Sequence, residues 1–235
     1  MSRPVVLAID GPAGAGKSTV AERLAHDLGY FYFDTGVLYR AVALRCLEDG
    51  TDLADEAALA RLVAGVTIQV RPPSVADGRQ LDVSLEGRDV SLQIRSPQVD
   101  AVVSRVAASP AVRAGLIDLQ RQQIQGAGTI MAGRDIGTVV CPDADLKIYL
   151  TASPGERAQR RLTQVGGAPE QLEATQQAIE ERDRLDSSRA ISPLVAAPDA
   201  IEIDSDGKSI DEVVQAVRDL LERRISERSA AGADR

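Results

Sequence analysis

The side chains best suited to chemistry lie near the N-terminus, where glycines, a lysine and a serine follow a fixed spacing. Residues 11–18 read Gly-Pro-Ala-Gly-Ala-Gly-Lys-Ser, which matches the pattern G-x-x-x-x-G-K-S of phosphate-binding loops. The glycines let the backbone turn successive N–H groups toward a polyphosphate. Lys17 adds a positive charge beside the phosphates, and the Ser18 hydroxyl is suited to bind Mg²⁺. The pattern therefore predicts a polyphosphate site with a metal ion.

The segments on either side of this loop have the order that phosphate binding requires. Residues 4–10 form an apolar run without alternation, which predicts a buried strand. Apolar residues then recur at helical spacing over 20–28, and Gly29 follows where a C-terminal cap is expected. Only three of the 27 lysines and arginines are lysines. A lysine at the defining position therefore argues against a glycine-rich turn that binds nothing.

The composition limits the class of partner. The 235 residues carry a net charge of −8, which is poorly suited to binding nucleic acid or an anionic membrane surface. No apolar run reaches membrane-spanning length, and residues 4–10 are predicted to form a strand, so we expect no signal peptide. Cys46 and Cys141 lack the spacing of a metal site, and His26, the only histidine, is expected to face solvent. We expect a cytoplasmic monomer that acts on small molecules.

Strands alternate with helices along the chain, which predicts an α/β fold with three layers, a parallel sheet having helices on both faces. Buried strands are predicted at residues 4–10, 30–33, 129–132, 146–150 and 200–203. Helices are predicted at about 20–28, 37–47, 56–64, 97–108, 110–125, from 154, at 170–185, and after a Ser209-x-x-Glu212 capping box. With the phosphate-binding loop after the first strand, this is the order of a P-loop NTPase fold with a five-stranded sheet.

Residues 65–95 depart from this pattern. Apolar and polar residues alternate there in three runs, around residues 66–70, 81–85 and 90–94, which is typical of half-exposed antiparallel strands. We expect a small three-stranded insert on a core made of residues 1–64 and 96–225. The small, polar residues 226–235 are expected to form a disordered tail.

Three predicted strand ends lead into loops rich in glycine and charge. They lie at residues 10–18, 34–40 and 133–137, and ligands of such sheets bind at the carboxyl ends of the strands, so we expect these loops to meet. Arginines gather in these loops and in the segment 155–189. Phosphoryl transfer between two phosphates needs fixed cations, and guanidinium groups bind phosphate with two donors.

Two of these arginines have an alternative explanation. Arg160 and Arg184 follow Glu156 and Glu180 by four residues, a spacing at which exposed ion pairs form on a helix. We expect these two arginines to lie on solvated helix faces.

Motifs beyond the first loop are more specific than the loop itself. They are Asp34-Thr35-Gly36-x-x-Tyr39-Arg40, Gly133-Arg134-Asp135-Ile136-Gly137-Thr138, and Glu181-Arg182-Asp183-x-x-Asp186-x-x-Arg189. Together with residues 10–19, they make the chain similar over nearly its whole length to bacterial-type cytidylate kinases. The resemblance implies transfer of the γ-phosphoryl group of ATP to CMP or dCMP with Mg²⁺, in pyrimidine nucleotide metabolism. It also implies a small antiparallel insert in the monophosphate-binding region and a short helical lid at about 155–189.

The resemblance implies a role for each matching residue. ATP would contact Gly11, Gly14, Ala15, Gly16, Lys17, Ser18 and Thr19, with Arg157 and Arg161 near the adenine nucleotide. CMP would contact Thr35, Arg40, Ser104, Arg113, Arg134, Asp135, Arg182, Asp186 and Arg189. Within that set, Arg40, Arg134 and Arg189 would hold the phosphate, and Arg182 and Asp186 would hold the pentose hydroxyls. Lys17, Arg134 and Arg189 would be the catalytic cations, and Ser18 the optional metal ligand.

The implied cytosine contacts agree with hydrogen-bond chemistry. Cytosine offers a donor at N4 and acceptors at N3 and O2, which match the Asp135 carboxylate and the Arg113 and Ser104 donors. An alternative role for Asp135 is holding Mg²⁺ through water. The alternatives for the whole chain are a P-loop kinase for UMP, AMP or a small metabolite, and a nucleotide-dependent switch that binds a protein.

Overall fold

The computed structural model describes residues 4–233, with side chains described through residue 230, and it divides into two compact units. Unit 1 comprises the described residues up to Tyr32 and those from Ile124 onward, and unit 2 comprises Phe33–Gln123. Unit 2 is therefore larger than the insert expected at residues 65–95. No helix in the described part of the chain is long and apolar enough to cross a membrane.

A five-stranded sheet carries the phosphate-binding loop. Its order is β2-β6-β1-β7-β8, with bounds β1 Val5–Asp10, β2 Phe31–Asp34, β6 Gly128–Gly133, β7 Leu146–Thr151 and β8 Ile201–Asp204. Strand β1 pairs in parallel with β6 and β7, and its last residue, Asp10, lies opposite Gly133. The loops after Asp10 and Gly133 therefore leave from adjacent strand ends, as the sequence predicts for residues 10–18 and 133–137.

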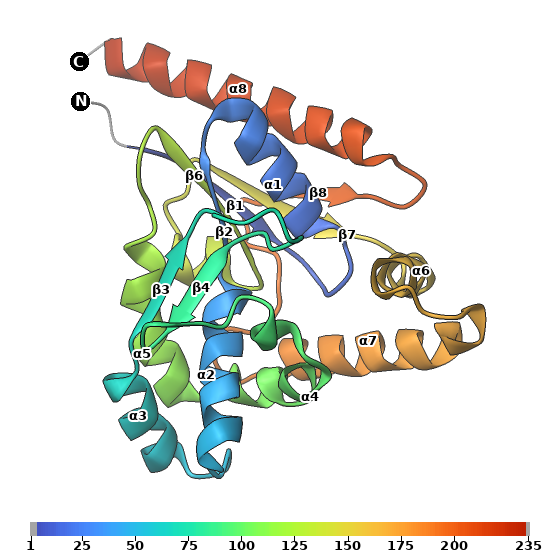
Figure 1. The fold of residues 1–235 in the computed structure, drawn as a ribbon. Coiled ribbons are helices and arrows are strands. Elements are labelled where there is room, and N and C mark those ends of the chain that lie inside the picture. The colour runs from blue at the N-terminus through green and yellow to red at the C-terminus, as the bar shows by residue number, and fades with distance from the viewer. Residues whose placement is uncertain (1–3, 234–235) are drawn as a thin grey trace. The chain divides into compact units, whose positions relative to one another are not determined.

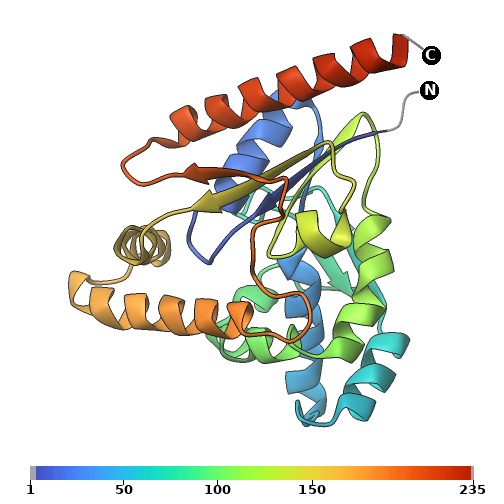
Figure 2. The same ribbon diagram turned by 180° about the vertical axis from the view of Figure 1, so that it is seen from behind.

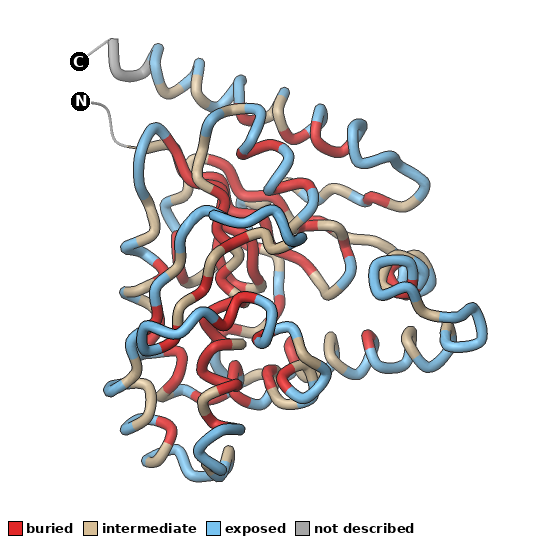
Figure 3. Tube along the Cα trace, viewed as in Figure 1, coloured by how far each residue is buried: buried red, intermediate tan, exposed pale blue. Residues whose placement is uncertain are grey.

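The helices of unit 1 cover the sheet and extend its carboxyl edge. They are α1 (Lys17–Leu28), α6 (Pro154–Val165), α7 (Leu172–Ser187) and α8 (Ile210–Ala233). In both views, α1 and α8 lie side by side along one face of the sheet (Figures 1 and 2). Buried residues follow the central strands and the helix faces next to them, including Leu7, Ile9, Leu24 and Ile130 (Figure 3). Apolar burial of this kind supplies most of the stability of the unit.

Unit 2 combines four α-helices with a small antiparallel sheet. The elements are α2 (Gly36–Asp49), α3 (Glu56–Gly65), β3 (Ile68–Arg71), β4 (Asp82–Leu85), β5 (Arg88–Asp89), α4 (Pro97–Val106) and α5 (Pro110–Arg121). The sheet order is β3-β4-β5, which confirms a three-stranded antiparallel insert.

The third strand of the insert ends earlier than expected. It covers only Arg88–Asp89, and Ile94 lies in a short 3-10 helix, η1 (Gln93–Arg95), so the prediction of a strand at 90–94 is wrong. The Asp89 carboxylate accepts hydrogen bonds from the Ser91 backbone N–H (2.9 Å) and hydroxyl (2.6 Å). In this local turn the Ser91 backbone N–H is bonded to the Asp89 side chain, so it does not extend the ladder between β4 and β5.

The C-terminal helix is longer than expected. Helix α8 continues to Ala233, where we expected a disordered tail from residue 226. Arg228 donates to the Asp145 carboxylate at 3.0 Å, which ties the last turns to the loop before β7. The expected tail residues 234 and 235 lie outside the described residues.

Several local expectations are confirmed. Gly29 ends α1 in the left-handed conformation, at a φ of 65°, as expected, and Gly50 ends α2 in the same conformation. The His26 side chain is 86% exposed, and both Cys46 and Cys141 are free and buried. At the start of α8, Ser209 and Glu212 form the predicted capping box. The Ser209 N–H donates to Glu212 (2.8 Å), and the Glu212 N–H donates to the Ser209 hydroxyl (3.2 Å).

The capping box gives a stability prediction. Ser209→Ala removes an acceptor for a helix N–H, so it should lower the free energy of unfolding by about 1 kcal/mol in urea titration. Ser226→Ala is the matched control, since that hydroxyl only donates to the Glu222 carbonyl within the same helix. The control should change stability by less than about 0.5 kcal/mol. Equal effects of the two substitutions would show that the cap is not the cause.

Candidate functional site

The phosphate-binding loop has the backbone geometry that its sequence predicts. Gly11 has a φ of 146°, and a Cβ atom there would lie 2.0 Å from the Leu150 carbonyl oxygen, so only glycine fits. Gly14 and Gly16 also have positive φ values, of 78° and 91°. The loop therefore bends tightly against the end of β7 and leads directly into α1.

The polar side chains of the loop are placed for an anionic ligand. Lys17 is buried, and its Nζ donates to the Pro12 carbonyl at 2.6 Å, which folds the ammonium group back over the loop. Ser18 is partly exposed in the first turn of α1, and its hydroxyl makes no hydrogen bond to the described residues. A hydroxyl so placed fits a ligand of Mg²⁺ that arrives with a polyphosphate.

A buried carboxylate joins this loop to the neighbouring strand end. Asp10 is 4% exposed, and it accepts hydrogen bonds from the backbone N–H groups of Ile136 (2.8 Å) and Gly137 (2.7 Å). These donors open the π-helical turn Ile136–Val140, which follows Arg134 and Asp135. Burial raises the pKa of Asp10 to about 6, and the negative charge of Asp135 adds to the shift in the same direction.

Two predicted arginines share one carboxylate. Asp186 on α7 accepts from Arg134 Nε at 3.0 Å and from Arg189 Nη2, and its side chain is 2% exposed. Arg182 lies one turn earlier on the same helix. Asp135 is buried next to Arg134 in the chain. The structure thus brings Arg134, Asp186 and Arg189 into one cluster that carries a net positive charge.

Helices α6 and α7 form the segment expected to be a lid. Arg157 is buried and contacts the Ala13 carbonyl of the phosphate-binding loop at 3.0 Å, whereas Arg161 lies partly exposed and pairs with Gln164 at 3.0 Å. Both arginines lie on α6, as the sequence predicts, and Arg157 contacts this loop through the Ala13 carbonyl.

The two arginines expected on solvated faces differ from each other. Arg160 pairs with Glu156 at 3.0 Å as predicted, and it also donates to the hydroxyl and carbonyl oxygens of Ser205. Arg184 is exposed, but its partner is Glu181 rather than Glu180, with the closer contact at 2.6 Å. The prediction of the Glu180 pair is therefore wrong, because the Arg184 side chain takes the alternative spacing of three residues.

Unit 2 holds the remaining predicted residues. Thr35 is buried at the start of α2, and Arg40 donates to the Ile94 carbonyl (3.0 Å) and to Asp100 (2.6 Å). Arg113 on α5 is also buried, and its Nε donates to the Ala107 carbonyl at the end of α4 (2.7 Å). Ser104 lies one turn before Ala107 and is partly exposed.

The surroundings of Arg113 include two side chains, Tyr39 and Gln120, that were not predicted to be site residues. The Arg113 guanidinium stands over the Tyr39 ring, 5.3 Å from its centre, and the Tyr39 hydroxyl accepts from Gln120 at 3.3 Å. Tyr39 belongs to the Asp34–Arg40 motif, which was the available signal, whereas nothing in the local pattern marks Gln120.

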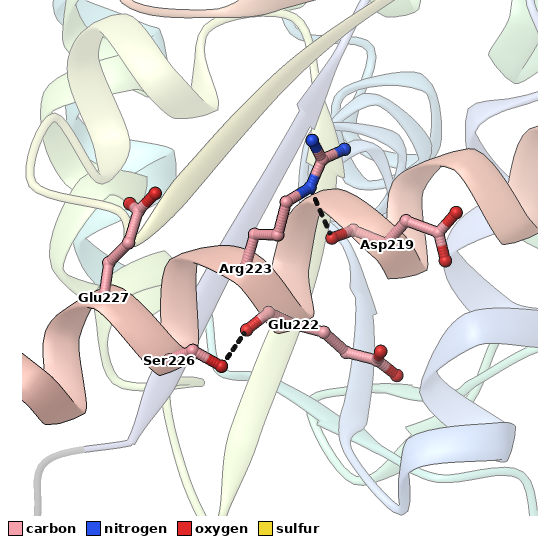
Figure 4. Close-up of a pocket in the computed structure, with 5 residues that line it drawn as sticks. All are labelled: Asp219, Glu222, Arg223, Ser226 and Glu227. Carbon is pink, nitrogen blue, oxygen red and sulfur yellow. Dashed lines mark hydrogen bonds between the residues drawn. The ribbon is translucent and has the colours of Figure 1, made fainter.

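Two surface hollows lie away from the predicted site residues. A hollow on α8 is lined by polar and charged residues of one helix face, Asp219, Glu222, Arg223, Ser226 and Glu227, and contains no predicted site residue (Figure 4). A second hollow, beside α2 and α3, contains none either. Among the described residues, no group of three or more His, Cys, Asp or Glu side chains could hold a metal ion.

Comparison with known proteins gives one consistent family. A family model for cytidylate kinase matches residues 7–223. The chain is 50% identical over 213 residues to a cytidylate kinase of Pelotomaculum thermopropionicum, covering 90% of this chain and 93% of that protein. It is 47% identical over 221 residues to a cytidylate kinase of Herpetosiphon aurantiacus, covering 94% and 96%. A solved structure of an uncharacterized protein from Eubacterium ventriosum shares the fold, with a TM-score of 0.51, 11% identity, and coverage of 94% and 99%.

The raised pKa of Asp10 gives a prediction about pH. The folded chain binds this proton more tightly than an unfolded carboxyl with a pKa of 3.8 does, so the contribution of Asp10 to stability rises as the pH falls through 6. We expect the unfolding free energy of the wild type minus that of Asp10→Asn to increase by about 2 kcal/mol from pH 7.5 to 4.5. Urea titrations across this range measure it, and a difference that stays constant or shrinks would contradict the assignment.

Proposed function

The chain belongs to the cytidylate kinase family, and on that premise we propose how its side chains transfer the γ-phosphoryl group of ATP to CMP and dCMP. The observation that carries the proposal is the position of the phosphate-binding loop in unit 1. The loop follows β1 and Arg134 follows the adjacent strand β6, so the loop begins next to the strand end that leads to the Arg134–Asp186–Arg189 cluster. A polyphosphate cradle with fixed arginines at the next strand end is what transfer between two phosphates requires.

The donor is ATP, and we propose that its phosphates bind the loop. Backbone N–H groups of residues 14–19 and the N-terminal end of α1 supply donors and positive potential, and Lys17 supplies the point charge. Gly11 makes the tight bend possible, and Arg157 and Arg161 on α6 are proposed to lie near the nucleotide. Mg²⁺ that accompanies ATP would offset phosphate charge, and the Ser18 hydroxyl is the protein group proposed to contact it.

The acceptor phosphate is proposed to bind Arg40 from unit 2 and Arg134 and Arg189 from unit 1. Each of these arginines is held by a carboxylate, Asp100 or Asp186, which orients the guanidinium before the substrate arrives. Arg134 and Arg189 are the proposed catalytic cations beside Lys17, because they can stabilise charge on the transferring group without moving. Arg182 and Asp186 are proposed to contact the pentose hydroxyls.

Cytosine is proposed to be recognised by one hydrogen-bond acceptor and two hydrogen-bond donors of the protein. The Asp135 carboxylate would accept from N4, and Arg113 and Ser104 would donate to N3 and O2. Arg113 is held by the Ala107 carbonyl and the Tyr39 ring, so its orientation is set before binding. Thr35, at the start of α2, is a further proposed substrate contact. The base specificity, the monomeric state and a cytoplasmic location are parts of this proposal.

The first test is removal of the loop cation. Lys17→Met should lower kcat for CMP by about 10²- to 10³-fold, since one fixed charge at the transferring group is lost. A coupled assay measures this, with ATP against CMP, dCMP, UMP and AMP, beside a thermal melt to confirm folding. Lys208→Met, at an exposed lysine, should leave kcat within about twofold. A folded Lys17→Met enzyme with near-normal turnover would place the reaction elsewhere.

The second test concerns base recognition. UMP presents a carbonyl to Asp135 and an N–H to Arg113, and such mismatches can sum to about 10³- to 10⁴-fold in discrimination. Asp135→Ala should therefore lower kcat/KM for CMP far more than for UMP, and so narrow their ratio.

The matched control is Asp211→Ala, which removes an exposed carboxylate on α8 and should keep the CMP-to-UMP ratio. Equal losses on both substrates in Asp135→Ala would favour a metal-holding or structural role for Asp135.

A further inference from the structure

Three groups from different elements meet at the phosphate-binding loop. Asp183 on α7 accepts a hydrogen bond from the Ala13 N–H at 3.2 Å, and it also accepts from Arg157 Nη1 on α6. The same Nη1 donates to the Ala13 carbonyl at 3.0 Å. Both backbone polar groups of Ala13 are therefore engaged by one ion pair. Asp183 is not among the residues assigned to ATP or CMP above.

The ion pair is largely removed from water. The Arg157 side chain is 6% exposed and that of Asp183 is 18% exposed. Helix α6 also lies close to the loop: a Cβ atom on Gly14 would be only 3.0 Å from Arg157 Cβ. At such a site the loss of either partner leaves a buried charge without its counter-ion. The pair is therefore a rigid part of the loop's surroundings rather than a mobile surface contact.

These contacts occupy one side of the Arg157 guanidinium. Its Nε donates to the Ala152 carbonyl at 3.0 Å, just after β7, and its Nη1 is shared between Ala13 and Asp183. Its Nη2 makes no hydrogen bond to the described residues. Because a guanidinium is planar, fixing Nε and Nη1 also fixes the direction of the Nη2 donors.

We propose that Asp183 is a positioning residue for the phosphoryl donor, which holds the Arg157 guanidinium against the loop so that Nη2 faces the ATP phosphates. This inference rests on the proposed binding of ATP in the loop. Asp183 itself does not touch the nucleotide. Its effect on ATP passes through Arg157, so the two residues should act as one unit.

A double-mutant cycle with Asp183→Asn and Arg157→Lys tests this dependence. Each single substitution should lower kcat/KM for ATP by about 10- to 100-fold, as is usual when the partner of a functional group is lost. Lysine keeps the charge of Arg157 but has no planar pair of donors. The kcat/KM for ATP of the double variant should lie within about threefold of the value for the less active single variant. The KM for ATP should rise more than the KM for CMP.

The matched control lies two residues earlier on the same helix. Glu181→Gln also neutralises a carboxylate paired with an arginine, Arg184, but that pair is exposed and three residues apart. It should leave kcat/KM for ATP within about twofold. A loss equal to that of Asp183→Asn would point to the charge of α7 rather than to the contact with Arg157.

Two outcomes of the cycle overturn the proposal. Losses that multiply in the double variant would show that Asp183 acts independently of Arg157. Equal increases in both KM values with a lower melting temperature would show a structural role alone. If Asp183→Asn does not fold, Arg157→Lys decides by itself, since wild-type affinity for ATP in that variant contradicts the assigned role of Nη2.

Calorimetric titration with ATP alone separates this inference from the proposed function. The same double-mutant cycle can be measured through the dissociation constant of ATP, and this measurement needs no phosphoryl acceptor. A wild type that binds ATP but leaves CMP unphosphorylated would overturn the acceptor assignment and keep the Asp183 test intact. Coupled losses of ATP affinity in the two variants support the proposal, and independent losses refute it.

Discussion

The bond between the Asp10 carboxylate and two backbone N–H groups is the contact on which the arrangement of unit 1 depends. Parallel register places Asp10 opposite Gly133, and the carboxylate then holds the N–H groups of Ile136 and Gly137. The turn that carries Arg134 and Asp135 is thereby attached to the strand that carries the phosphate-binding loop. Burial disfavours the ionised carboxylate, and the two backbone donors offset part of that cost. The same contact therefore fixes geometry and sets the electrostatics at the strand end.

Pairing of four of the candidate-site arginines with carboxylates is the second recurring feature. Asp186 holds Arg134 and Arg189, Asp183 holds Arg157, and Asp100 holds Arg40. A guanidinium has five N–H donors, so one carboxylate can orient it and still leave donors for a phosphate. This arrangement lets a chain with a net charge of −8 present local cationic groups to anionic substrates.

Hydrophobic periodicity and caps were enough to predict the five buried strands and the main helices, and the spacing of the glycines with Lys17 and Ser18 predicted the phosphate-binding loop. Buried strands such as β1 and β6 have continuous apolar runs, and Gly29 and Gly50 mark helix ends through a conformation that glycine adopts readily. The third strand of the insert was mispredicted because an alternating pattern does not show that Asp89 will bond to Ser91.

The contacts of the candidate site were harder to predict than its residues. The motifs named Arg134 and Asp186, and the family resemblance added Arg157, but neither showed the partner of each side chain. Asp183 is 170 residues from Ala13 in the chain, and Asp10 is 126 residues from Ile136, so no local spacing predicts either bond. The π-helical turn after Asp135 depends on that distant acceptor, and intrinsic propensity does not favour such a turn. The sequence shows which side chains are suited to the site, but only the folded structure shows which of them bond to one another.

The acceptor of the Asp10 contact is a side chain, but its donors belong to the main chain. Replacing Ile136 by alanine keeps its N–H group, so a systematic alanine scan would register only lost apolar packing at that position. Proline is the one natural residue that deletes the donor itself. A mutational map of this protein built from side-chain truncations would therefore assign the link to Asp10 alone and miss its other half. Amide hydrogen exchange at Ile136 and Gly137 reports directly on that half, because both protons are held by a buried carboxylate.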